Sequence, residues 1–134
     1  LEDKQSKIER VFSKEEDKMY LIDFYIGEME YQYNKYSKAI PYLTRYIKFI
    51  DKRDKKEQRV NNRLAEALYY LGNSYKNTSK INNAINAWKQ VLAIDKNKGM
   101  WSELAKSQIS LVTWKKEIYE SATLQKPTLK KYFH

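Results

Sequence analysis

Cysteine is absent from this chain of 134 residues, so it forms no disulfide and offers neither a thiolate nucleophile nor a cysteine ligand for a metal. Only 3 glycines and 2 prolines interrupt the sequence. Because these residues mark turns and break helices, their scarcity favours a few long helices over many short strands. No stretch approaches the roughly 18 apolar residues that a membrane-spanning helix needs. The sequence therefore predicts one all-α domain over residues 1–134, with no membrane span.

Histidine occurs once, as His134, so neither a Ser–His pair nor a histidine metal site has a centre. The chain also lacks a glycine-rich phosphate-binding loop. Neighbouring carboxylates such as Glu28 and Glu30 are more typical of a solvated helix face than of acid–base catalysis. We therefore expect no catalytic residue, no cofactor and no metal site, and we expect that the protein is not an enzyme.

Negative charge is the scarcer sign: 17 Asp and Glu stand against 26 Lys and Arg, a net charge of +9. Such an excess attracts acidic proteins, nucleic acid or anionic lipid headgroups. The most basic run falls within residues 48–63 and is interrupted by acidic residues: Lys48, Lys52, Arg53, Lys55, Lys56, Arg59 and Arg63. The run is a candidate site for an acidic protein surface or anionic headgroups, although a solvated helix face is the favoured explanation. A basic helical nucleic-acid-binding domain is the alternative function, and nucleic acid is the less favoured partner because the sequence carries no nucleic-acid-binding motif.

Helical periodicity divides the first half of the chain. Residues 4–12 predict a short N-terminal helix, and Ser13 is expected to cap a second one that runs to about Tyr33. Ser37 is expected to cap the third, with Pro41 in its first turn or so, where few amides have an internal partner. Its apolar stripe recurs every three or four residues: Ala39, Ile40, Leu43, Tyr46, Ile47 and Ile50.

In the second half, residues 51–63 are almost wholly polar and predict exposed helix with a possible bend. A helix from about Leu64 is expected to end at residues 77–79, and Asn82 or Asn83 to begin the next, which ends at residues 95–99. The last helix is expected over residues 99–120, before a basic tail at 121–134. Its predicted apolar members are Leu104, Ile109, Leu111, Val112 and Trp114.

An internal repeat underlies this pattern. Gly27 and Gly72 are 45 positions apart (72 − 27), and Ala39 and Ala84 repeat that spacing (84 − 39). A glycine on one helix and an alanine on the next allow two backbones to approach closely, with larger apolar side chains around them. We therefore expect these positions to mark equivalent contacts in two helix pairs.

Residues 65–98 resemble a tetratricopeptide repeat, a helix pair of about 34 residues. The resemblance lies in Leu68, Leu71, Gly72 and Tyr75 on the first helix, and in Ala84 and Trp88 followed by residues 91–95 on the second. Lys96 stands where the family usually has proline. A more degenerate unit covers residues 20–53, with Gly27, Ala39 and Leu43 retained but Asp23 and Glu30 at positions that are usually apolar or tyrosine.

The resemblance implies a short right-handed solenoid of antiparallel helix pairs, with residues 99–120 as its capping helix. The period exceeds the family's by about 11 residues, close to three helical turns, so a helical extension at residues 54–64 preserves the facing of the stripes. Such long repeats resemble those of bacterial envelope-assembly scaffolds, an analogy of architecture alone. The chain starts at Leu1, so we expect a mature or shortened form; the compartment stays open, with the bacterial periplasm or cell envelope favoured over the cytoplasm.

The family's usual peptide-binding groove is lined by the first helix of each pair, so the resemblance implies a partner-binding face here. In the second unit its positions are Glu66, Tyr69, Tyr70, Asn73, Lys76 and Asn77. Asn73 resembles the family's anchor for a peptide backbone, and Lys76 is suited to a carboxylate. An ordinary solvated helix face explains the same residues equally well.

In the first unit the corresponding groove positions are strongly aromatic: Leu21, Phe24, Tyr25, Glu28, Tyr31 and Gln32. With Ile22, Ile26 and Met29 on its other side, this helix requires cover on two faces. Either the N-terminal segment or a partner protein is expected to supply it. The sequence thus favours a non-catalytic protein-interaction scaffold with a second protein as its partner, and an acidic surface on that partner would suit the net positive charge.

Overall fold

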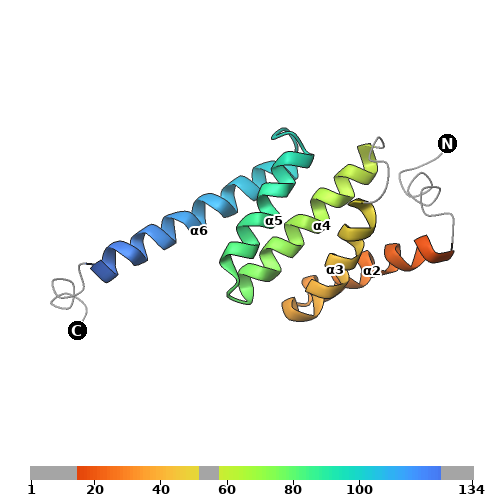
Figure 1. Ribbon diagram of the computed structural model, residues 1–134, viewed down its shortest axis with the longest axis horizontal. Coiled ribbons are helices and arrows are strands. Elements are labelled where there is room, and N and C mark those ends of the chain that lie inside the picture. The colour runs from red at the N-terminus through yellow and green to blue at the C-terminus, as the bar shows by residue number, and fades with distance from the viewer. Residues whose placement is uncertain (1–14, 52–57, 125–134) are drawn as a thin grey trace.

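The computed structural model describes residues 15–51 and 58–124, and these residues form five α-helices and no strand (Figure 1). The helices are α2 (Glu15–Gln32), α3 (Tyr36–Asp51), α4 (Gln58–Asn77), α5 (Ile81–Ile94) and α6 (Met100–Leu124). Each packs antiparallel against the next one along the chain, which confirms the predicted all-α class. Helix α4 also contacts both α2 and α6, so these three helices form one side of the molecule.

The core lies between consecutive helices and is built from the stripes on α3, α4 and α5. On α3 the inward side chains follow the spacing of three and four residues: Ala39, Leu43, Tyr46, Ile47, Phe49 and Ile50. On α5 they are Ala84, Ala87, Trp88 and Val91. Burial of these apolar faces is the main source of stability for helices of this length, which are marginal alone in water.

Both helix pairs pack through a glycine. In α2–α3, a Cβ placed on Gly27 lies 2.8 Å from the Leu43 side chain, and in α4–α5 a Cβ on Gly72 overlaps the Trp88 ring. Leu43 and Trp88 are themselves 45 positions apart (88 − 43), each one turn beyond the buried Ala39 or Ala84. The two pairs therefore make the same close contact at the same offset, with different side chains.

The turns correct several predicted helix starts. Helix α3 begins at Tyr36, because Asn34 takes a left-handed conformation (φ 62°) and the Lys35 carbonyl accepts the first backbone bonds, so Ser37 lies inside the helix. Pro41 consequently falls in the second turn, where it is exposed to solvent. Helix α5 begins at Ile81 after left-handed Ser79 (φ 64°), ahead of the predicted asparagines, and no side chain caps it.

The predicted helix over residues 99–120 is found, but it continues to Leu124, and of its predicted apolar members only Val112 is buried. The predicted members Leu104, Leu111 and Trp114 are exposed, and Ile109 is half-buried. The buried residues of α6 are the small Ser102, Ala105 and Val112, and Trp101 and Ile109 are partly buried against the core. The other large apolar residues of α6 lie on its outer face.

Other expectations fall partly or wholly outside the described residues. These are the N-terminal helix at residues 4–12, the Ser13 cap, residues 54–57 of the extension at 54–64, and the basic tail after residue 124. Within residues 58–63, Val60 is 2% exposed, so this part of the predicted exposed helix has an inward side. None of the described helices is both long enough and apolar enough to span a membrane.

Candidate protein-binding surfaces

A row of aromatic rings crosses the side of the molecule formed by α2, α4 and α6. Tyr31 of α2 stacks on Tyr70 of α4, with ring centroids 4.5 Å apart and an interplanar angle of 24°. Tyr70 meets Trp101 of α6 edge to face at 5.8 Å, and Tyr69 contacts the same ring at 5.6 Å. Three predicted groove residues are therefore brought together, although much of their surface is used to join the helices.

Asn73 links this row to the core by two hydrogen bonds. Its Nδ2 donates to the Tyr31 hydroxyl at 2.8 Å, and its Oδ1 accepts from Trp88 Nε1 at 3.2 Å. The residue is only 7% exposed. The amide that the sequence suggested as a peptide anchor thus has its oxygen and its nitrogen engaged within the chain. Burial raises the pKa of the Tyr31 hydroxyl, and the bond from Asn73 opposes that rise.

A pair of carboxylates faces the same side. Glu28 of α2 lies near Glu66 of α4, and burial followed by the charge of Glu66 raises the pKa of Glu28, while Arg63 lowers it. The Tyr70 hydroxyl donates to Glu66 Oε2 at 2.8 Å, and burial together with this bond raises the pKa of Tyr70. Glu28 is therefore coupled across two helices, and is not simply a solvated charge. In the described ranges no group of three or more His, Cys, Asp or Glu side chains is placed to hold a metal ion.

The aromatic side of α2 is covered by the chain itself. Leu21 is buried and Phe24 is 1% exposed; Phe24 contacts the Tyr46 ring at 5.1 Å, and the Arg63 guanidinium lies 4.8 Å from its centroid. One of the two faces of α2 is therefore covered by α3 and α4, whereas Ile22 and Met29 on the other side are exposed. The N-terminal segment lies outside the described residues, so cover of that side by this segment or by a partner stays a prediction. Tyr25, beside Phe24, retains 37% exposure under the same guanidinium.

The remaining predicted groove residues lie towards the end of α4 and on α2. Asn77 is exposed and its Nδ2 donates to the Asn73 carbonyl at 2.8 Å, while half-buried Lys76 donates to Gln108 Oε1 of α6 at 2.9 Å. Gln32 is exposed at the end of α2. Among the repeat positions, Gly27, Ala39, Leu71, Gly72, Ala84 and Trp88 are buried and Tyr75 is half-buried.

The largest exposed apolar surfaces lie elsewhere, on the outer faces of α2 and α6. On α2 they are Met19, Ile22, Met29 and Tyr33, and on α6 they are Met100, Leu104, Leu111, Trp114, Ile118 and Tyr119. Leu104, Leu111 and Ile118 recur every seven residues, which places them on one side of the helix. That spacing is visible in the sequence, but only the structure shows that the stripe faces away from α5.

Comparison of the chain with models of protein families, with curated proteins and with solved structures found no match to any of them. The tetratricopeptide resemblance therefore stays a prediction from the sequence of this chain.

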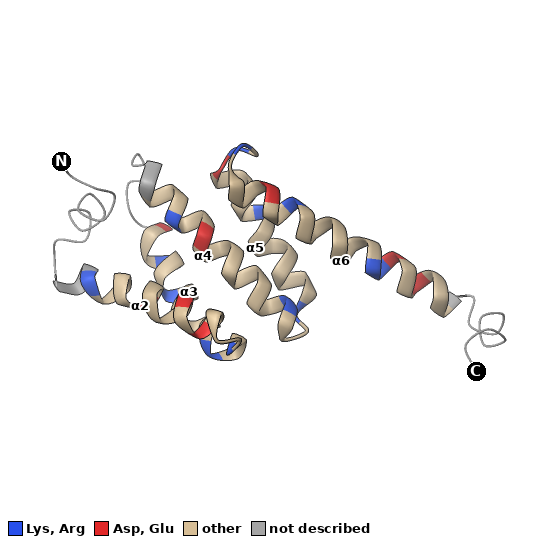
Figure 2. Cartoon of the chain, turned by 180° about the vertical axis from the view of Figure 1, so that it is seen from behind, with Lys and Arg blue, Asp and Glu red and all other residues tan. Residues whose placement is uncertain are grey.

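The distribution of charge does not single out one binding surface among the described helices. Figure 2 shows basic and acidic residues interspersed along most of the described helices; the exception is α5, whose only charged residue is Lys89. Of the basic run at 48–63, Lys48 is exposed and Arg63 lies over the rings of Phe24 and Tyr25, whereas the side chains of residues 52–59 are outside the described set. Arg63 is thus a packing residue as well as a charge.

Proposed function

We propose that this chain is a non-catalytic scaffold that binds another protein, with its helix pairs stacked as a short tetratricopeptide-like right-handed solenoid ending in α6. The equivalence of the Gly27–Leu43 and Gly72–Trp88 contacts supports the repeat architecture. The observation that carries the function is the exposed apolar stripe on α6.

The stripe is unusually apolar for a surface helix. Trp114 is 59% exposed and Ile118 is 53% exposed, and Leu111 precedes them on the same side. Soluble proteins leave single apolar residues exposed without consequence, but a contiguous row of large ones, tryptophan included, is typical of an interface. Spacing of three, four and seven residues suits contact with another helix, because it presents one straight ridge.

The length of α6 supports the same proposal. This helix has 25 residues and its antiparallel neighbour α5 has 14, so about 16 Å of α6 extends past α5 at 1.5 Å per residue. In Figure 1 the second half of α6 runs beyond the other helices. A helical segment of that length without tertiary cover is marginal in water. A bound partner helix would stabilise it.

The experiment is capture of partner proteins from the source cells by the tagged chain, compared with the variant Trp114→Ser/Ile118→Ser. Both side chains are exposed, so helicity should be unchanged while specific capture falls at least about fivefold. The matched control is Ser110→Ala/Thr113→Ala, two exposed positions of the same helix outside the stripe, which should capture as wild type does. Equal capture by all three proteins would exclude the stripe as the binding surface.

The alternative function is nucleic-acid binding, which the net charge of +9 favours. Titration with mixed DNA and RNA at low and moderate salt separates the two functions, because phosphate contacts give affinity that falls steeply with salt. Tight, steeply salt-dependent binding that survives Trp114→Ser/Ile118→Ser would favour a nucleic-acid partner over a protein.

A further inference from the structure

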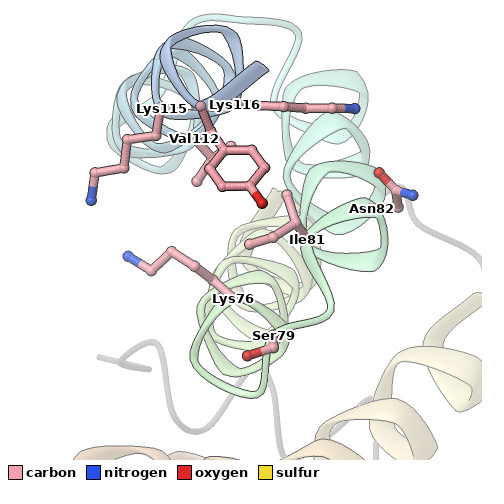
Figure 3. A pocket seen from close by; sticks show the side chains of 8 residues that line it. Lys76, Ser79, Ile81, Asn82, Val112, Lys115 and Lys116 are labelled. Atoms are coloured by element: carbon pink, nitrogen blue, oxygen red, sulfur yellow. The ribbon is translucent and has the colours of Figure 1, made fainter. Parts of the chain in front are cut away.

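A cleft lies where α6 extends past the start of α5, next to the turn that joins α4 to α5. The cleft lies between the last turn of α4, the first turn of α5 and the second half of α6, and has a volume of about 590 Å³. Figure 3 shows the side chains that line it. Such a volume is within the range of sites that hold a small ligand or a few peptide side chains.

The cleft combines an apolar floor with cations at its edges. Ile81, Val112 and Tyr119 supply the apolar part of the lining. Figure 3 shows the Lys115 and Lys116 side chains leaving α6 in opposite directions, with the Lys76 side chain on the same side as Lys115. No acidic side chain is among the residues that line it; Glu117 and Glu120 of α6 are not part of the lining. The three ammonium groups therefore surround an apolar centre without a carboxylate between them.

These ammonium groups have N–H donors that are not used in hydrogen bonds or ion pairs among the described residues. Lys76 uses one on Gln108 Oε1 at 2.9 Å, and within the described residues no ion pair engages Lys115 or Lys116. By contrast, Lys106 on the same helix approaches Glu103 Oε1 at 3.4 Å. Lysines held near an apolar pocket without an internal carboxylate attract an external one, since that contact is both charged and partly desolvated.

We propose that this cleft binds an acidic peptide segment of the partner protein, seating one aliphatic or aromatic side chain on Ile81, Val112 and Tyr119 while flanking carboxylates meet the three lysines. The proposal rests on the scaffold function and names the chemistry of its partner. The apolar floor favours a peptide over a nucleic acid, because a phosphate backbone gains little from an aliphatic surface, whereas a leucine side chain gains most of its burial energy there.

The test uses the whole chain and fluorescent synthetic peptides in which glutamates flank a leucine, measured by anisotropy at moderate salt. Wild type should bind this peptide, and should bind the versions with Gln for Glu, or with Ser for Leu, about tenfold more weakly, a factor that corresponds to about 1.4 kcal/mol. Failure of the acidic peptide to bind, or equal binding of all three peptides, would overturn the proposal.

Variants locate the site. Lys115→Gln/Lys116→Gln should weaken binding about tenfold, and Tyr119→Ser should weaken it severalfold, since Tyr119 is exposed and its loss leaves the fold intact. The control Lys89→Gln/Lys98→Gln removes two exposed lysines outside the cleft lining and should bind as wild type does. An equal loss in the control would show a general effect of net charge, and thereby contradict the cleft.

Two further outcomes distinguish this inference from the scaffold function. If the acidic peptide fails to bind but capture of partners still depends on Trp114 and Ile118, the cleft is wrong and the scaffold stands. If a short oligonucleotide of equal charge competes as well as the acidic peptide, the site recognises charge alone and the peptide proposal fails.

Discussion

The two helix pairs make a close contact at equivalent positions, but with different residues. In α4–α5 the aromatic ring of Trp88 fills the space beside Gly72, and Asn73 holds that ring by a hydrogen bond. In α2–α3 the smaller Leu43 lies beside Gly27. A polar residue also replaces an apolar one: Asp23 stands 45 positions before Leu68. The close contact in the second pair is therefore made by a rigid ring held by a hydrogen bond, whereas the contact in the first pair is made by the aliphatic Leu43 side chain.

The carboxylate of Asp23 has a charged partner within the first pair. Arg45 of α3 forms two bonds to its carboxylate, from Nε to Oδ2 and from Nη2 to Oδ1, both at 3.2 Å. The Arg45 guanidinium also lies 4.7 Å from the centroid of the Tyr42 ring. A bidentate pair of this kind gives the degenerate unit a specific contact where the second pair has an apolar one.

The largest expected difference between the pairs comes from adding a methyl group to each glycine. Gly72→Ala places a Cβ into the Trp88 ring, which cannot move without losing its bond to Asn73, so we expect a loss of about 2–3 kcal/mol. In Gly27→Ala the new Cβ lies 2.8 Å from the buried Leu43 side chain and 3.2 Å from its backbone nitrogen, an overlap smaller than that with the Trp88 ring. The gain in helix propensity offsets part of the cost, so we expect a loss of about 1 kcal/mol. Urea denaturation of both variants measures the difference. Equal losses would contradict the contrast between the pairs.

Removing the hydrogen bond that fixes Trp88 should cost less. Asn73→Ala leaves the Trp88 N–H buried without its partner and releases the Tyr31 hydroxyl, for an expected loss of about 1–2 kcal/mol. Asn77→Ala, one turn further along α4 at an exposed position, is the control and should change stability by less than about 0.5 kcal/mol. Thermal unfolding followed by circular dichroism compares them; similar melting temperatures would show that the Asn73 network adds little.

Replacing Asp23 by leucine, the residue at the equivalent position of the second pair, should change the free energy of unfolding very little. Asp23→Leu replaces an ion pair whose side chains are 16% (Asp23) and 51% (Arg45) exposed, and such pairs contribute about 0–1 kcal/mol. We expect stability within about 0.5 kcal/mol of wild type, together with a weaker dependence on salt, whereas Asp23→Ala should lose up to about 1 kcal/mol. A loss above about 2 kcal/mol in Asp23→Leu would mean that this ion pair is essential to the pair's packing.

The smallest effect concerns the carboxylates between the pairs. The pKa of Glu28 is raised above its ordinary value of 4.5, so the folded protein holds this proton more tightly than the unfolded chain does. Stability from this group is therefore greatest at low pH and is lost as pH rises from about 4.5 through the raised pKa. Glu28→Gln should raise the melting temperature at pH 7 by about 1–3 °C, and the gain should shrink below pH 4.5. A gain that is the same at both pH values would exclude Glu28 as its source.

The sequence predicted the helices and the equivalence of the pairs, because the 45-residue spacing of Gly27 and Gly72 and the stripe on α3 are local signals. It did not predict which face of α6 is buried. That choice depends on the small residues Ser102 and Ala105, whose effect appears only when α5 packs against them. Nor did it predict that Asn73 bonds to Tyr31, a contact across 42 positions.

For the candidate binding surfaces the outcome is similar. The aromatic residues predicted on α2 and α4 do come together, yet Phe24, Tyr31 and Tyr70 use their rings to hold helices to each other. The two proposed binding surfaces are the exposed stripe on α6 and the cleft lined by Lys76, Lys115 and Lys116. Both follow from the difference in length between α5 and α6 and from the order in which the helices pack. The residues that line these surfaces do not by themselves determine the helix lengths or the packing order.

The most direct test of the scaffold function is amide hydrogen exchange along α6, in the chain alone and in the complex with a captured partner. In the free protein, residues 113–123 should exchange quickly, because they extend past α5 and lack its cover, while the amides of α5 exchange slowly. Binding should slow exchange by about tenfold or more in residues 113–123 and leave α5 beyond its first turn unchanged. Identical exchange of this segment in the two samples would contradict the proposal that α6 is the surface through which this protein binds its partner.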